Sequence, residues 1–268
     1  MDLAAFFDRP QDALLADPGL PGALAELLAS LESGSVRAAS RGADGAWRAN
    51  PWVKTAILAG FRASATVEVP GWPTPSFDRE LYPPRAFGPG DGVRLVPGGT
   101  AVRRGAHVAP GVVVMPPAYV NVGAFVDEGT LVDSHALVGS CAQVGRRVHL
   151  SAGVQVGGVL EPAGALPVVV EDDAFVGGLC GLFEGVVVRR RAVLAPGVLL
   201  TASTRIFDLV EGRERVREVP EGAVVVPGTR PASGPYARGA GLSVYAPCIV
   251  KYRDERTGAS TALEEALR

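Results

Sequence analysis

An aliphatic residue recurs at every sixth position through the middle of this chain. A first run ends at Val156, and a second begins at Val170 after a shift of two positions that follows Gly157. The residues at this position of the period are Val96, Val102, Val108, Val114, Val120, Val126, Val132, Val138, Val144, Leu150, Val156, Val170, Val176, Leu182, Val188, Leu194, Leu200 and Ile206. Most repeats also carry a small or β-branched residue four places later, and a turn-forming residue often follows the aliphatic one.

This period excludes the two common secondary structures as its cause. An amphipathic helix needs apolar residues about 3.6 positions apart, and a half-buried strand needs them about 2 apart. Six residues suffice for one short strand and one corner, and three such units make a triangular coil of about 18 residues with the aliphatic side chains stacked inside. We therefore predict an all-β solenoid, a parallel β-helix. The alternative, a β-sandwich with chance spacing, does not account for two phased runs.

The chain divides into three parts. We predict an N-terminal helical domain at residues 1–88, the β-helix at 89–210 and a C-terminal cap at 211–268. In the first part, leucines spaced between positions 14 and 31 predict two short helices, and the stretch 52–61 predicts another.

The break in the period predicts a feature outside the coil. Between Gly157 and Val170 we expect a loop that leaves the solenoid, and such loops often cover a site on its flank. The final part is expected to hold a solvated hairpin at 211–218, strands at 223–226 and 242–250, and an amphipathic helix at 260–268.

Composition fits a solenoid with many corners and excludes several classes of function. The chain has 34 glycines and 22 prolines, which suit tight corners. No apolar run is long enough to span a bilayer and the start has no basic leader, so we expect a cytoplasmic protein without membrane contact. Cysteines at 141, 180 and 248 lack metal-binding spacing, which predicts reduced thiols and no metal. A net charge of −2 gives no reason to expect nucleic acid as a partner.

One long block carries a family resemblance. Residues 115–162, MPPAYVNVGAFVDEGTLVDSHALVGSCAQVGRRVHLSAGVQVGGVLEP, closely resemble the tetrahydrodipicolinate N-succinyltransferases of the bacterial lysine pathway. The resemblance extends over nearly the whole chain. Its other segments are Trp47, Trp52–Lys54, Phe61–Arg62, Gly92–Pro97, Ser203–Asp208, Val219–Val226 and Val244–Lys251. The β-helix of that family is left-handed, so the resemblance implies the same hand here.

The resemblance implies a homotrimer with active sites in clefts between neighbouring prisms. Succinyl-CoA or another acyl-CoA would lie along the cleft, beside a small amino acid that accepts the acyl group. Arg94 would hold a substrate carboxylate, because a guanidinium fork can bind two oxygens at once. Asp133 would contact the substrate amine, which must lose a proton before it can attack a thioester. Candidate contacts for the CoA moiety are Lys251, Thr201 and Arg205.

The chain departs from the family pattern in one coil. The family usually reads Gly-Ala-Arg-Ser-Glu-Val-Val-Glu-Gly, whereas residues 177–185 read Gly-Gly-Leu-Cys-Gly-Leu-Phe-Glu-Gly. The family's Arg and Ser become Leu179 and Cys180. Its first Glu, the supposed catalytic partner of the Asp, becomes Gly181. A charged pair is thereby lost, which is hard to explain in an enzyme with an unchanged substrate.

Two residues are candidates to replace the lost carboxylate. Glu184 survives from the family pattern and is a candidate catalytic residue, although a Glu before Gly185 also suits a plain turn. His135 replaces an aromatic residue near Asp133 and is a candidate substrate contact; an exposed imidazole without function is an equally simple explanation. Asp133 itself occupies a corner where Asp is common for turn reasons alone.

Three functions remain open from the sequence. The first is succinyl transfer from succinyl-CoA to tetrahydrodipicolinate. The second is acylation of a different amino acid, or use of a different acyl-CoA such as acetyl-CoA, which the changes at Leu179, Gly181 and His135 suggest. The third is an inactive structural homologue, against which the retained Arg94 and Asp133 argue.

Overall fold

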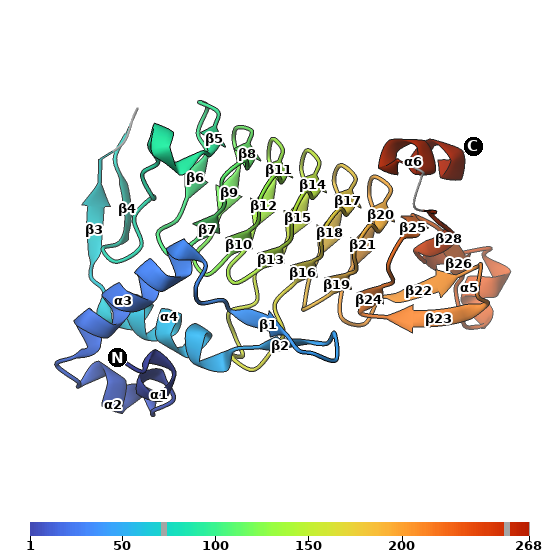
Figure 1. Cartoon of the computed structure of the whole chain (residues 1–268). Coiled ribbons are helices and arrows are strands. Elements are labelled where there is room, and N and C mark those ends of the chain that lie inside the picture. Colours follow the sequence, from blue (N-terminus) through green and yellow to red (C-terminus); the bar gives the residue numbers. More distant parts are fainter. Residues whose placement is uncertain (71–73, 255–257, 268) are drawn as a thin grey trace.

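The computed structural model describes residues 1–70, 74–254 and 258–267, and its centre is the predicted parallel β-helix (Figure 1). Successive coils pair in parallel with a register of 18 residues: Phe125 lies beside Gln143, and Val126 lies beside Val144. Each coil contributes one two-residue strand to each of three sheets, with corners between them. The fold class expected from the period is therefore confirmed, and it is that of the left-handed hexapeptide solenoids.

The three sheets form three faces, which differ in what covers them. The covered face consists of β7 (His107–Val108), β10 (Phe125–Val126), β13 (Gln143–Val144), β16 (Val169–Val170), β19 (Val187–Val188) and β24 (Glu218–Val219). The open face consists of β6 (Ala101–Val102), β9 (Tyr119–Val120), β12 (Leu137–Val138), β15 (Gln155–Val156), β18 (Gly181–Leu182) and β21 (Leu199–Leu200). The long face begins with β5 (Arg94–Leu95), β8 (Val113–Val114), β11 (Leu131–Val132), β14 (His149–Leu150), β17 (Phe175–Val176), β20 (Val193–Leu194) and β25 (Ala223–Val226).

The interior of the solenoid is the stack of aliphatic residues that the period marks. Val132, Val144 and Leu150 are fully buried, as are nearly all their equivalents in other coils. The small residue of each repeat, such as Ala142 or Ala192, fills the narrow part of the triangle. A single corner separates each buried position from the next along the chain. The stack of buried side chains therefore fixes the position of every corner residue.

The first coil departs from the predicted phase. The period places Val96 in the interior, but Leu95 pairs with Val114 and packs against the core, so the register here is 19 residues. Gly98 and Gly99, both with positive φ, take up the extra residue before Val102 returns to the common phase. Leu95 and Val96 are adjacent and both aliphatic, so the sequence pattern does not reveal this shift.

Helices and two hairpins form the N-terminal part. The helices are α1 (Leu3–Phe7), α2 (Gln11–Leu15), α3 (Leu20–Ser33) and α4 (Pro51–Ala63), and a 3₁₀ turn follows at Pro89–Asp91. The expected helices around 14–31 and 52–61 are confirmed. The hairpins β1 (Ala39–Arg41) with β2 (Trp47–Ala49), and β3 (Thr66–Val69) with β4 (Ser76–Arg79), were not predicted.

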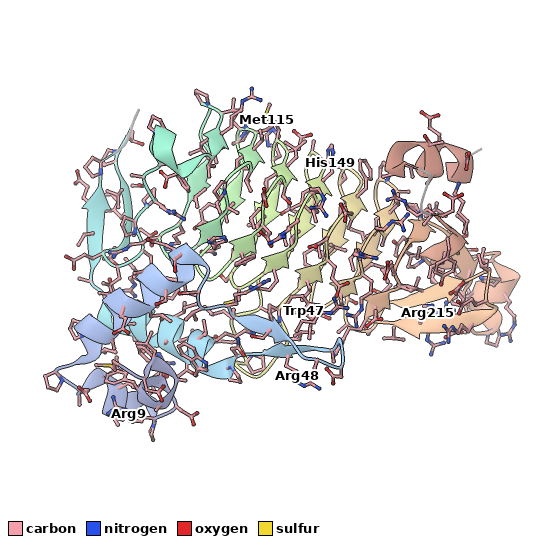
Figure 2. All side chains as sticks on the ribbon, in the orientation of Figure 1. Arg9, Trp47, Arg48, Met115, His149 and Arg215 are labelled. Atoms are coloured by element: carbon pink, nitrogen blue, oxygen red, sulfur yellow. The ribbon has the colours of Figure 1, made fainter. Side chains whose placement is uncertain are left out.

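This N-terminal part packs on the covered face. The Arg37 guanidinium lies 3.7 Å from the ring centroid of Phe125 on β10 and donates to the Gln143 amide oxygen. Trp47 reaches across from β2 and its Nε1 donates to the buried Glu171 carboxylate at 2.9 Å (Figure 2). The open face receives no comparable cover: Tyr119, Leu137 and Gln155 are partly exposed on it, and Leu199 is 49% exposed.

The C-terminal part extends the long face and caps it. It contains β22 (Arg205–Asp208), β23 (Arg213–Val216), β26 (Thr229–Pro231), α5 (Pro235–Gly239), β27 (Ser243–Tyr245), β28 (Cys248–Tyr252) and α6 (Ala259–Leu267). The strand expected at 223–226 and the final helix are confirmed. The hairpin expected at 211–218 begins earlier, because β22 pairs with β23. The strand expected at 242–250 is divided into β27, which pairs with β26, and β28, which joins the long face. Helix α6 buries Ala262 against Val193 and Val224 of the long face. The domain limits at residues 88 and 210 stay a prediction. No helix among the described ranges is long and apolar enough to cross a lipid bilayer.

Shortening one interior side chain should show that the stack dominates stability. Leu150→Ala removes a fully buried side chain, so we expect the free energy of unfolding to fall by about 2–5 kcal/mol. The matched control is Leu209, which is 63% exposed. Leu209→Ala should change the free energy of unfolding by less than about 0.5 kcal/mol. Chemical denaturation at one protein concentration measures both. Equal effects would show that the interior stack is not the main source of stability.

Candidate functional site

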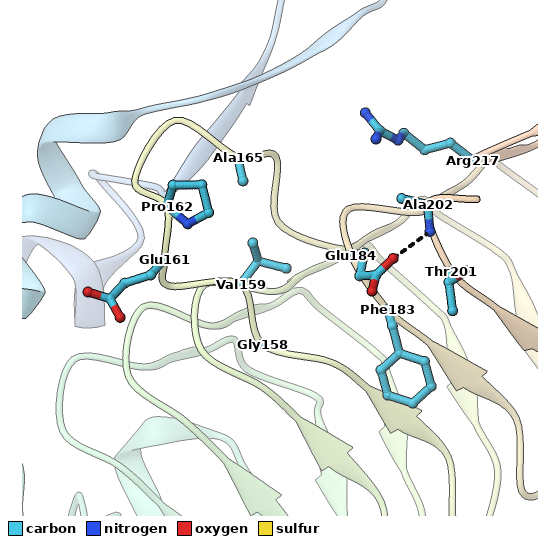
Figure 3. Close-up of a pocket in the computed structure, with 10 residues that line it drawn as sticks. All are labelled: Gly158, Val159, Glu161, Pro162, Ala165, Phe183, Glu184, Thr201, Ala202 and Arg217. Carbon is cyan, nitrogen blue, oxygen red and sulfur yellow. Dashed lines mark hydrogen bonds between the residues drawn. The ribbon is translucent and has the colours of Figure 1, made fainter. Parts of the chain in front are cut away.

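A loop leaves the solenoid where the sequence period breaks. It occupies the corner between β15 and β16, and Glu161, Pro162 and Ala165 project from it (Figure 3). One residue of the N-terminal part fixes it: Lys54 of α4 is fully buried, and its Nζ donates to the carbonyl oxygen of Ala165. Burial lowers the pKa of Lys54. The loop is therefore attached to the helical part as well as to the coil.

Beneath this loop lies a cavity of about 550 Å³, here called the loop pocket. Its residues are Gly158, Val159, Glu161, Pro162, Ala165, Phe183, Glu184, Thr201, Ala202 and Arg217. The loop forms one wall, two successive corners of the coil form the floor, and Arg217 comes from the segment after β23 (Figure 3). Most of the lining is apolar, with carboxylates and a guanidinium as the charged groups.

Glu184 and Thr201, both proposed from the sequence, meet in the loop pocket. Glu184 sits at a corner with a left-handed backbone (φ 56°), and its Oε2 accepts a hydrogen bond of 3.2 Å from the Ala202 amide. Thr201 Oγ1 lies 2.9 Å from Thr204 Oγ1 and 3.3 Å from Ser203 Oγ. Two corners that are one coil apart are thus held together by the glutamate.

Asp133 and His135 lie on a different corner, between the long face and the open face. The Asp133 Oδ1 accepts the Ser134 amide at 2.7 Å, and its other oxygen has no hydrogen-bond partner among the described residues. His135 is exposed, has φ 62°, and lines a shallow hollow with Tyr119 and Gln155 of the open face. Asp133 therefore presents one fixed and one available carboxylate oxygen at the edge of that hollow.

His149 is a histidine whose pKa is affected by the charge of Asp133. It faces outward on the long face, with its ring centroid 4.9 Å from that of Phe175 (Figure 2). Burial lowers the pKa of His149, and the Asp133 carboxylate partly offsets this effect. The sequence suggested His135 as the neighbour of Asp133, but the structure gives the two side chains no mutual hydrogen bond within the described ranges.

Within one chain, Asp133 and Glu184 do not come together. They flank opposite edges of the open face and belong to coils two steps apart. Adjacent strands are spaced by about 4.8 Å, so the offset along the axis alone is roughly 10 Å. Within one chain the two carboxylates are therefore separated both along the axis and across the open face.

The remaining predicted contacts are scattered over the long face. Arg94 is exposed on β5 at the first coil. Lys251 on β28 forms an ion pair of 2.7 Å with Glu265 of α6, and Arg205 on β22 lies 3.6 Å from Glu214. The structure does not bring these three residues to the loop pocket. No group of three or more His, Cys, Asp or Glu residues within the described ranges is arranged to hold a metal ion.

In the coil that departs from the family pattern, apolar side chains surround Gly181 on the open face. Gly181 faces outward on the open face, and a Cβ built there would lie 2.5 Å from the Phe183 ring and 2.9 Å from Leu199. The space above residue 181 is therefore filled by apolar side chains. Leu179 at the neighbouring corner is 73% exposed.

Cys180 in the same coil is not a nucleophile. Its Sγ is buried and lies 3.1 Å from the Ala195 carbonyl oxygen. Burial raises the pKa of Cys180 to about 11 and that of Cys141 to about 12. Neither thiol forms appreciable thiolate near neutral pH, so a covalent thioester on these residues has no support.

Sequence reasoning missed Phe183, Lys54 and Arg217. Lys54 lies in the Trp52–Lys54 segment that carried the resemblance, which was its only signal. Arg217 belongs to a charged segment that looked like an ordinary solvated hairpin, and nothing in its spacing marks it.

Comparisons with known proteins agree on one family. Residues 4–63 match the family model described as tetrahydrodipicolinate N-succinyltransferase, N-terminal, and residues 167–202 match the hexapeptide repeat of succinyl-transferase. A 2,3,4,5-tetrahydropyridine-2,6-dicarboxylate N-succinyltransferase of Bradyrhizobium diazoefficiens is 46% identical over 92% of this chain and 89% of its own length. The enzyme of the same name from Rhodopseudomonas palustris (strain BisA53) is 45% identical over 98% of this chain and 96% of its own.

One solved structure is also similar, though more weakly. A crystal structure from Campylobacter jejuni, provisionally assigned as a 2,3,4,5-tetrahydropyridine-2-carboxylate N-succinyltransferase, has a TM-score of 0.48 and 15% identity. It covers 84% of this chain and 62% of that one. The resemblance inferred from the sequence is confirmed by the family models and the curated relatives, without this structure.

Removing the Lys54 amine should loosen the loop. In Lys54→Met the Ala165 carbonyl loses its donor, so amide hydrogen exchange in residues 158–166 should become at least several-fold faster. Lys251→Met changes the only other lysine of the chain and should leave exchange in this loop unchanged. Hydrogen–deuterium exchange with mass spectrometry measures both variants. Unchanged exchange in Lys54→Met would mean that the coil alone holds the loop.

Proposed function

This chain belongs to the tetrahydrodipicolinate N-succinyltransferase family, and from that premise we propose that it transfers a succinyl group from succinyl-CoA to the ring nitrogen of tetrahydrodipicolinate. We propose further that it works as a cytoplasmic homotrimer and needs no metal. The observation that carries the chemical proposal is the carboxylate of Asp133, with one oxygen held by the Ser134 amide and the other available at the edge of the open face.

The proposed reaction is direct. The ring nitrogen of tetrahydrodipicolinate is an imine, so a water molecule first adds to the C=N bond and gives an amine that carries an N–H. This amine loses a proton to Asp133, and its nitrogen attacks the thioester carbonyl. An amide C–N bond forms and the C–S bond breaks, so that CoA leaves as a thiolate that takes up a proton. No acyl-enzyme is needed, in agreement with the high pKa values of Cys141 and Cys180. Positioning of the two substrates and proton removal supply the rate.

A shared site follows from the separation of Asp133 and Glu184. Each residue flanks the open face, where Leu137 and Leu199 leave apolar surface exposed to solvent. If this face packs against the next copy, Asp133 of one chain can approach Glu184 of another across a cleft. Three copies close such a ring with one kind of contact, as a triangular prism allows.

Features of the coil at residues 177–185 bear on which substrates the protein uses. Phe183 and Leu199 fill the space above Gly181, and Leu179 offers no charge at the next corner. These features favour a second candidate function: transfer of a smaller acyl group, or acylation of a less charged amino acid. A cleft with less positive charge should bind a dicarboxylate or a succinyl group less well.

Asp133→Asn should separate catalysis from binding. Loss of a general base typically lowers the rate by about two to four orders of magnitude, while affinity for CoA should change little. Asp127→Asn is the matched control, because Asp127 also follows an aliphatic residue and accepts the next backbone amide, at 2.8 Å. Release of the CoA thiol reports turnover. A rate near that of the wild type in Asp133→Asn would make Asp133 a corner residue only.

Competition between thioesters should decide the substrate. Under the family function, kcat/KM with tetrahydrodipicolinate should be at least about tenfold higher for succinyl-CoA than for acetyl-CoA, since one productive charge contact contributes that much. A preference for acetyl-CoA, or for an acceptor with fewer carboxylates, would support the second candidate. Absence of turnover with every thioester and acceptor would leave an inactive homologue.

A further inference from the structure

Arg217 is the cationic residue of the loop pocket. It follows β23, and its side chain extends over the pocket toward the loop that carries Pro162 and Ala165 (Figure 3). The residue is exposed, so its guanidinium is available to a ligand.

The backbone at Arg217 is in a conformation that favours glycine. Its φ is 66°, in the left-handed region, which a residue with a Cβ adopts only against its preference. The same region is occupied by glycines at many corners of this chain, among them Gly129 and Gly197. Corner residues such as Cys141 and Leu179 share this conformation, so what sets Arg217 apart is the surroundings of its side chain.

Other arginines with this backbone have partners, and Arg217 does not. Arg147, with φ 52°, forms a two-point ion pair with Asp173, and Arg191, with φ 60°, donates to the Asp254 carbonyl oxygen. Among the residues that the structure describes, the Arg217 side chain has neither a hydrogen bond nor an ion pair. Its charge is left for something that the chain itself does not supply.

The rest of the loop pocket suits a small ligand with both charges. Glu184 stands on the floor with one carboxylate oxygen held by Ala202 and the other without a partner among the described residues. Glu161 points away from Glu184, on the far side of the loop (Figure 3). Between the two charged groups the lining is apolar, with Val159 and Phe183. A guanidinium and a carboxylate with apolar lining between them fit a carboxylate ligand that also carries an amine, and disfavour a multiply charged phosphate.

We propose that Arg217 binds a substrate carboxylate in the loop pocket, with the amine of the amino-acid acceptor directed toward Glu184. This inference rests on the proposed acyl transfer and adds an anchor for the acceptor on the Glu184 side of the open face. The succinyl end of the thioester carries the same chemical group and is the other source of such a carboxylate.

The test is Arg217→Gly in the full-length protein. Calorimetry should show binding of tetrahydrodipicolinate weakened by about 10- to 100-fold, the loss expected for one hydrogen bond to a charged group. In turnover, KM for that acceptor should rise by a similar factor while kcat changes by less than about threefold, because an anchor acts on ground state and transition state alike. Because glycine prefers the left-handed backbone, the variant should unfold at the same temperature or higher, which separates lost binding from lost folding.

Arg191→Gly is the control, since it removes a guanidinium from the same backbone conformation away from the loop pocket. It should leave KM and binding unchanged. If Arg217→Gly instead weakens binding of succinate and raises KM for succinyl-CoA but not for acetyl-CoA, the carboxylate is that of the acyl group.

Two outcomes would overturn the inference. One is unchanged binding of both tetrahydrodipicolinate and succinate, and the other is an equal rise in KM for both thioesters, which would assign Arg217 to CoA itself. Failure of the proposed function is recognised separately, because the wild type would then show no turnover while the binding measurements still report on Arg217.

Discussion

The interior stack of aliphatic side chains is the constraint on which the rest of this molecule depends. Val132, Val144 and Leu150 are buried between the coils above and below, and the register of 18 residues follows from them. With the interior positions fixed, the three residues of each corner can vary without loss of the fold. The functional candidates Asp133 and Glu184 both use this freedom, because each lies at a corner.

The same regularity separates Asp133 from Glu184 within one chain. Corners on one edge of a face line up along the axis, whereas corners on opposite edges are separated by the width of the face. Asp133 and Glu184 lie on opposite edges of the open face, and the proposed shared site brings them together by placing a second copy against that face. The loop held by Lys54 and the guanidinium of Arg217 then form the outer wall of the pocket around Glu184. The three faces thus have different roles. The covered face attaches the N-terminal part, the long face is capped by α6, and the open face is the proposed contact between copies.

Much of the fold could be predicted from the sequence because burial repeats with a fixed period. The break after Gly157 marked the loop, and leucine spacing marked α3. In the first coil Leu95 rather than Val96 takes the interior position. The sequence did not predict this, because both side chains are suited to the interior. The hairpins β1–β2 and β3–β4 escaped notice since their stability comes from contacts with distant residues, such as Trp47 with Glu171, rather than from local pattern.

The site was predictable only in part. Family resemblance led to Asp133 and Glu184, but their separation depends on the geometry of the coils. Arg217 could not be found at all, because neither its left-handed backbone nor its missing partner leaves a trace in the sequence.

Subunit complementation tests the shared site most directly. Asp133→Asn and Glu184→Gln chains, each inactive alone, would be co-purified as mixed assemblies and assayed for release of CoA. If each site takes Asp133 from one chain and Glu184 from its neighbour, random mixing leaves about one quarter of the sites with both native residues, and roughly that fraction of wild-type activity should return. Mixed assemblies that stay as inactive as either parent would contradict a site built from two copies.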